Sequence, residues 1–297
     1  MNSITDYRSE TTTSKVLQAL FIELIYKAKS HVPAVLTQND DEELHQYRVT
    51  LRKMHSILHE FGDCMDKDIY GLLKLELKLM IEPTNELRDM DVFLENMDAY
   101  RAMLQSRHKK SLASVENRLK IERGKSFDGV KQFVKSPEYL GMLSIVNDLT
   151  REDKFYSSCS LNPIDQVLKN RIAKRYQSIR ESATKLSRKD DPAAFHKLRI
   201  SVKKLRYLIE TFAHLFAPKP CAKASKQLKT FQTRLGRLQD IHIQMHHIAE
   251  DMKSGDEAAR LLLAILKNER KKSLKKVFKS IETFTDPSFE KRLGKLL

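Results

Sequence analysis

The segment FHKLRISVKKLRYLIE, residues 195–210, places one histidine and five cationic side chains among apolar residues. At about 100° per residue of an α-helix, the polar side chains fall on one stripe and the apolar ones on the opposite face. The stripe consists of His196, Arg199, Lys203 and Arg206. Cations that recur every one or two turns suit a linear anion, whereas enzymes usually combine unlike groups such as a nucleophile and a base. The pattern therefore favours anion binding over catalysis.

The same pattern occurs once more, 151 residues earlier in the chain. HQYRVTLRKMHSILHEF (45–61) aligns with HKLRISVKKLRYLIETF (196–212), and it carries His45, Arg48 and Arg52 on the equivalent stripe. The same offset aligns LRDMDV (87–92) with LQDIHI (238–243), and Lys78 with Lys229. Several blocks at one offset indicate a tandem duplication. We predict repeats at 14–156 and 164–297, joined by the linker SSCSLNP at 157–163.

The composition predicts an all-α protein, because 297 residues contain only eight glycines and eight prolines. Each repeat is predicted to form four helices, the third with a break before the LRDMDV or LQDIHI block. The other helices are expected at about 14–31, 41–62 and 101–135, and at about 165–187, 192–216 and 256–283. We predict a single domain over 1–297, built from two four-helix bundles related by a pseudo-two-fold axis, in which the stripes of the two basic helices converge on one groove.

The positive charge is unevenly distributed. The chain carries a net charge of +15; residues 1–150 hold 21 Lys and Arg against 23 Asp and Glu, and residues 151–297 hold 33 against 16. A chain this basic favours a polyanionic partner. One interpretation of the imbalance is that cations of the second half extend the groove on that side, namely Lys223, Lys226, Lys229, Arg234 and Arg237.

The cysteines and the apolar runs indicate the cellular compartment in which the protein is expected to lie. The three cysteines are far apart and form no CxxC motif, which argues against a disulfide framework or a zinc ribbon. The N-terminus lacks an apolar leader, and the longest apolar runs are too short to cross a bilayer. We expect a cytoplasmic protein that does not associate with membranes.

The blocks HxxRVxxRK with LRDMDV, and HKLRISVKKLRYLIE with LGRLQD, resemble the CHAD family, the conserved-histidine α-helical domain. The resemblance covers nearly the whole chain. It implies two pseudo-symmetric four-helix bundles whose basic helices line a basic central groove or pore, and a module that binds inorganic polyphosphate and accompanies polyphosphate granules. Because the chain lacks the ExExK signature of the triphosphate-hydrolysing domain that is fused to some members, we expect a stand-alone binder without catalysis, cofactor or metal. Together with the aligned lysines, the implied contacts are His45, Arg48, Arg52, Lys53, Lys78, Arg88, His196, Arg199, Lys203, Lys204, Arg206 and Lys229.

The sequence departs from the family pattern at two positions. His55 stands where the first motif usually has another arginine, which should weaken the grip of that helix at neutral pH. Asn85 aligns with Gly236, which puts the backbone turn before Arg88 in doubt.

Other charged residues receive structural interpretations. Asp89 and Asp240 are expected to orient the cations through an ion pair with Arg88 or Arg237 rather than to catalyse. The pairs His55 with His59 and His242 with His246 have metal-ligand spacing, but a third ligand is lacking in the sequence.

Nucleic acid is the main alternative ligand, because any basic groove attracts a phosphate backbone. Against it, the chain has no tryptophan and no recognisable nucleic-acid motif, and Tyr47 and Tyr207 are the aromatic residues nearest the stripes. A helical scaffold for an acidic protein is a third interpretation, although a scaffold does not need the same cation row twice.

Overall fold

The computed structural model describes residues 7–37, 41–151, 161–187, 192–251 and 257–296. Within these ranges the chain forms eleven α-helices joined by loops and short 3-10 helices. An isolated β-bridge joins Thr12 to Pro163. The predicted all-α class is confirmed. Most of the predicted linker at 157–163 lies outside the described residues.

The helices of the two halves follow a similar order. Those of the first half are α1 (Thr13–Thr37), α2 (Asp41–Glu60), α3 (Lys67–Ile81), α4 (Asn85–Ala102), α5 (Leu112–Lys135) and α6 (Pro137–Leu149). Those of the second half are α7 (Ile164–Lys185), α8 (Pro192–Thr211), α9 (Pro218–Asp251), α10 (Glu257–Thr285) and α11 (Pro287–Leu293). The starts of α1, α2 and α3 precede those of α7, α8 and α9 by 151 residues each. This agreement supports the tandem duplication, which stays a prediction.

Helices α6 and α11 add to the four helices predicted for each half. Both begin at a proline that follows a capping residue. Ser136 Oγ accepts a hydrogen bond from the backbone N–H of Tyr139 at 3.2 Å, and the Asp286 carboxylate accepts one from that of Ser288 at 2.8 Å. The dipeptides Ser-Pro and Asp-Pro were therefore the sequence signals for these two helices.

The third helix differs between the halves in a way that the sequence analysis did not predict. In the first half, α3 and α4 are separated by the short 3-10 helix η3 (Glu82–Thr84), where Pro83 lacks the N–H that a continuous α-helix would use. Arg234 occupies the equivalent position in the second half, and α9 runs unbroken through Gly236. The predicted break before the LQDIHI block is therefore wrong, because the break follows the proline and not the glycine.

Two hydrophobic cores hold the helices together. The larger core takes side chains from both halves, and the buried residues described for the smaller one come from α4, α5, α9 and α10. In α4, Leu87 belongs to the larger core and Met90 to the smaller one. In α9, Leu238 belongs to the larger core and Ile241 to the smaller one. Polar residues of both helices therefore lie between the cores.

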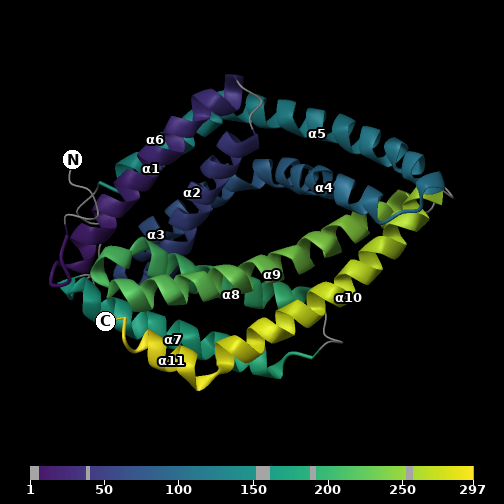
Figure 1. Cartoon of the computed structure of the whole chain (residues 1–297). Coiled ribbons are helices and arrows are strands. Elements are labelled where there is room, and N and C mark those ends of the chain that lie inside the picture. The colour runs from purple at the N-terminus through teal and green to yellow at the C-terminus, as the bar shows by residue number, and fades with distance from the viewer. Residues whose placement is uncertain (1–6, 38–40, 152–160, 188–191, 252–256, 297) are drawn as a thin grey trace.

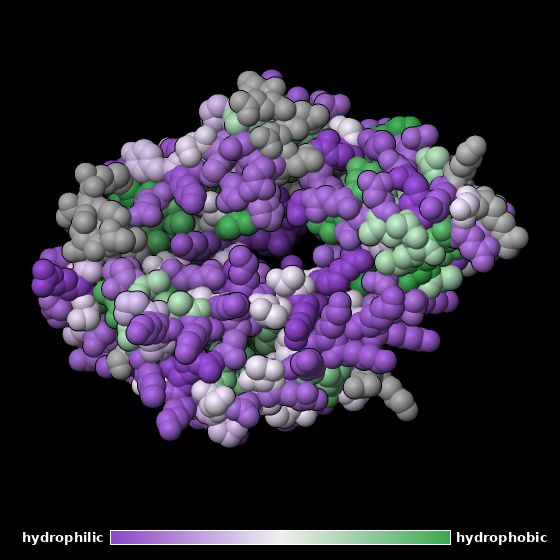
Figure 2. Space-filling model, in the orientation of Figure 1, coloured by the Kyte–Doolittle hydropathy of each residue, from purple (hydrophilic) through white to green (hydrophobic). Residues whose placement is uncertain are grey.

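The arrangement leaves the centre of the molecule open. Figure 1 shows the pairs α4–α5 and α9–α10 diverging and meeting again at one end, where α10 contacts α5 and the 3-10 helix η4 (Ser106–Ser111). In the same orientation, Figure 2 shows a hollow at the centre of this face, bordered mainly by hydrophilic residues. The polar stretch between the two cores is the part of α4 and α9 that can face such a hollow.

A buried ion pair fixes α5 on α4. Arg123 Nε donates to Asp91 Oδ1 at 2.8 Å, and the Asp91 side chain is 1% exposed. The substitution Arg123→Ala removes the guanidinium from a buried carboxylate, so we expect the free energy of unfolding to fall by about 3 kcal/mol in urea denaturation. As a control, Lys78→Ala removes an exposed pair with Glu82 (3.3 Å) and should cost less than about 0.5 kcal/mol. Equal losses in the two variants would contradict a stabilising role for the buried pair.

Candidate functional site

Helices α2 and α8, which carry the two predicted stripes, pack against each other. Phe61 and Phe212 occupy equivalent positions directly after these helices, and their ring centroids are 5.9 Å apart. Contact between equivalent residues is what a two-fold axis between the halves would produce. It brings the cations of both stripes into one region.

Five of the predicted residues form what we call the cation cluster: Arg48 and Arg52 of α2, Arg88 of α4, and Arg199 and Lys203 of α8. Burial lowers the pKa of Arg52, and the charge of Arg199 on the other helix lowers it further. Burial, followed by the charge of Arg52, lowers the pKa of Arg48 to about 9, so this guanidinium still carries its proton at neutral pH. The cluster thus concentrates positive charge where water is partly excluded.

Neutral acceptors hold the two arginines of α2. Arg48 Nη1 donates to Thr84 Oγ1, and its Nη2 donates to Asn85 Oδ1 at 3.1 Å. Arg52 Nη2 donates to the same Asn85 oxygen at 3.0 Å. Sequence analysis noted Asn85 only as a departure and missed this role; its alignment with Gly236 was the available signal.

The equivalent arginine of α8 lacks such acceptors. Leu235 and Gly236 stand where the first half has Thr84 and Asn85, so neither side chain can accept a hydrogen bond. A Cβ atom at position 236 would lie 3.8 Å from Arg199 Nε. This Nε is buried and has no hydrogen-bond partner among the described residues.

Lys203 is the member of the cluster whose pKa is lowered closest to neutrality. Burial lowers its pKa to about 7, and the next causes are the charges of Arg52 and Arg199. Lys203 therefore titrates close to neutral pH in the free protein. An anion in the cluster would restore the positive charge.

Two carboxylates lie beside the cluster, Asp89 on α4 and Asp240 on α9. Burial raises the pKa of both, that of Asp240 to about 6, and the nearby arginines oppose this rise. The expected ion pairs with Arg88 or Arg237 are not formed, because Arg88 pairs with Glu95 at 3.0 Å and Arg237 donates to Asn96 Oδ1 at 2.7 Å. The two aspartates balance the cluster through longer-range attraction instead.

The histidines and Arg206 border the cluster. Burial lowers the pKa of His45, as does the charge of Arg88, so His45 is neutral at pH 7. His196 has a buried Nδ1 without a hydrogen-bond partner among the described residues. Arg206 donates to Gln232 Oε1 at 2.8 Å and to Glu210 Oε1 at 3.3 Å, so acceptors of the protein already hold its guanidinium.

The remaining predicted lysines lie in other surroundings. Burial lowers the pKa of Lys53 and of Lys204, and nearby glutamates oppose this shift: Glu23 and Glu210 for Lys53, and Glu60 for Lys204. Lys78 and Lys229 are exposed on α3 and α9. Their role as ligand contacts stays a prediction.

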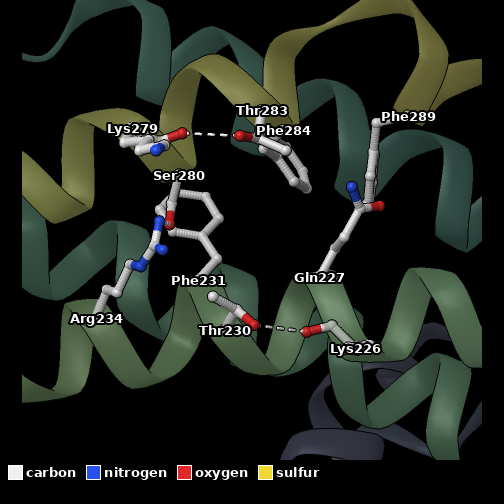
Figure 3. A pocket seen from close by; sticks show the side chains of 10 residues that line it. All are labelled: Lys226, Gln227, Thr230, Phe231, Arg234, Lys279, Ser280, Thr283, Phe284 and Phe289. Carbon is white, nitrogen blue, oxygen red and sulfur yellow. Dashed lines mark hydrogen bonds between the residues drawn. The ribbon is translucent and has the colours of Figure 1, made fainter.

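Part of the excess charge of the second half lies on the outer side of α9. Lys226 and Arg234 line a cavity of about 230 Å³ between α9, α10 and α11, together with Phe231, Phe284 and Phe289 (Figure 3). Arg234 Nη1 donates to Ser280 Oγ at 2.8 Å and to the Lys276 carbonyl at 3.2 Å. Lys226 and Arg234 therefore lie where α9 packs against α10 and α11, and their proposed part in extending the central groove stays a prediction.

The histidine pairs with metal-ligand spacing gain no support. Within the described part of the chain, no group of three or more His, Cys, Asp or Glu side chains could hold a metal ion. Burial, followed by the charge of Lys203, lowers the pKa of His55 to about 4. Burial is the main cause that keeps His55 neutral, and the nearby charges of Lys203 and Lys204 would also repel a metal cation.

The fold and this site define a helical protein whose two halves join at a shared cation cluster, an arrangement suited to anions. The model of the CHAD domain matches residues 19–249. The chain therefore belongs to the CHAD domain family, which is associated with the binding of polyphosphate or triphosphate and whose members are generally binding domains.

Two solved structures share the fold. The crystal structure of the CHAD domain from the plant Ricinus communis is 18% identical, with a TM-score of 0.74 and 93% of each chain covered. PptA from Streptomyces chartreusis is 15% identical, with a TM-score of 0.74 over 92% of this chain and 99% of that chain. Among the curated proteins, none matches. None of the described helices is both long and apolar enough to cross a membrane.

Proposed function

We propose that this protein binds inorganic polyphosphate at the cation cluster, without catalysing its turnover, in the cytoplasm and in association with polyphosphate granules. The observation that carries the proposal is the convergence of Arg48, Arg52, Arg199 and Lys203 from two helices into a partly buried region where their charges destabilise one another. Binding a polyanion relieves this repulsion, and arginine suits forked contacts with phosphate oxygens.

The surroundings of the cluster favour phosphate chains over nucleic acid. Binding of single-stranded nucleic acid usually adds stacking of bases on aromatic side chains. Tyr47 and Tyr207 are 1% and 6% exposed, and the Arg206 guanidinium lies 5.1 Å from the centre of the Tyr207 ring. Neither of these two rings therefore offers a base an open face, whereas a polyphosphate chain needs only the charges.

A competition titration tests the proposal. Long-chain polyphosphate competes at physiological salt with single-stranded and duplex DNA of matched total charge. We expect polyphosphate to be preferred by more than about tenfold, and the triple variant Arg48→Ala, Arg199→Ala, Lys203→Ala to lose that preference. Equal competition by DNA together with an unaffected triple variant would show a general polyanion surface instead.

A further inference from the structure

We infer that the two halves of the cluster are unequal: Arg199 and Lys203 form the principal phosphate anchor, and Asn85 weakens the corresponding anchor at Arg48 and Arg52. The inference rests on the proposed function. It assigns to Asn85 and Gly236, which do not carry charge, the role of setting how strongly each half holds a phosphate.

In the first half, the guanidinium groups of Arg48 and Arg52 already have hydrogen-bond acceptors without a ligand. A single amide oxygen, Asn85 Oδ1, accepts from Nη2 of Arg48 at 3.1 Å and from Nη2 of Arg52 at 3.0 Å, and Thr84 accepts from Arg48 Nη1. A phosphate that approaches these donors must displace or share the amide oxygen. The gain from each new charge-assisted bond is then reduced by the loss of an existing one.

The second half offers an unoccupied donor, Arg199 Nε. Arg199 Nε is buried without a hydrogen-bond partner among the described residues, and Gly236 leaves the space beside it without a side chain. A buried donor without a partner is unfavourable in the free protein. A phosphate oxygen at this position would therefore satisfy Arg199 without displacing a side-chain acceptor at position 236, and it would lie beside the Lys203 charge.

Exchanging the two small residues tests the asymmetry. Gly236→Asn supplies an amide where the first half has one, so we expect tripolyphosphate to bind about tenfold more weakly in isothermal titration calorimetry. Asn85→Ala releases Arg48 and Arg52, so we expect binding to strengthen by about threefold or more. Gly236→Ala adds a Cβ atom without an acceptor, at an ordinary contact distance from Arg199, and should bind like the wild type.

The salt dependence separates ligand contacts from damage to the fold. The slope of log affinity against log salt should become shallower in Gly236→Asn and steeper in Asn85→Ala, because the number of phosphates neutralised changes. If Gly236→Asn and Asn85→Ala both bound tripolyphosphate with the affinity of the wild type, the inference would be overturned while the proposed function remained intact. A wild-type protein that does not bind tripolyphosphate or longer chains would instead overturn the proposed function.

Discussion

The double variant Arg199→Ala, Lys203→Ala is expected to bind long-chain polyphosphate at least about a hundredfold more weakly than the wild type. Each substitution removes a charged donor from a partly buried site, where a charge-assisted hydrogen bond contributes about 1.5–3 kcal/mol. Two such losses correspond to a factor of about a hundred or more in the dissociation constant. Fluorescence anisotropy with end-labelled polyphosphate at fixed pH and salt would measure the dissociation constant of each variant.

The matched control is Lys271→Ala, Lys275→Ala. It removes the same number of positive charges at two exposed positions of α10 that are not among the predicted contacts. A loss of less than about threefold is expected, because exposed charges are screened by salt. If the control lost as much affinity as the double variant, binding would depend on total charge rather than on the cluster.

The affinity for polyphosphate is expected to fall by about tenfold or more as the pH rises from 6 to 8. Lys203 has a pKa of about 7 in the free protein, so above pH 7 it must take up a proton when an anion binds. Asp240, with a pKa of about 6, acquires a negative charge over the lower part of this range and then repels the ligand. Both effects have the same sign, and each coupled proton contributes at most about tenfold per pH unit.

Two variants test whether Lys203 and Asp240 cause the pH dependence of the affinity. Lys203→Arg keeps the charge at all pH values and should flatten the profile above pH 7. Asp240→Asn removes the repulsion and should raise the affinity while flattening the profile near pH 6. Long chains are the appropriate ligand, because only their terminal phosphates titrate near neutrality. A wild-type affinity that is independent of pH would contradict the assignment to Lys203 and Asp240.

Sequence periodicity and the internal offset predicted the helices that matter most for the site. The apolar face of α8, with Leu198, Val202 and Leu205, is buried, and the polar face carries Arg199 and Lys203. Such information is local, because the side chains three or four residues apart on one helix share a face whatever the rest of the chain does. The packing of α2 on α8 followed from the repeat.

Partners across helices could not be predicted in the same way. Asp89 and Asp240 had adjacent or nearby arginines in sequence, yet Arg88 pairs with Glu95 and Arg237 with Asn96. The consecutive residues Arg88 and Asp89 point in different directions, whereas Arg237 and Asp240, three residues apart, share a face of the helix. Sequence proximity therefore does not choose the partner. The opposite faces of α9 posed the same problem, since the exposure of Lys226 and Arg234 depends on where α10 lies.

The smaller core also bears on how the protein folds. Its side chains come from α4 and α5 in one half and from α9 and α10 in the other, and the Tyr100 hydroxyl donates across it to Gln244 Oε1 at 2.6 Å. Neither half can complete this core by itself. Although the repeats look like separable units in the sequence, they must fold cooperatively, and the long loop closure between them predicts slow folding for an all-helical chain.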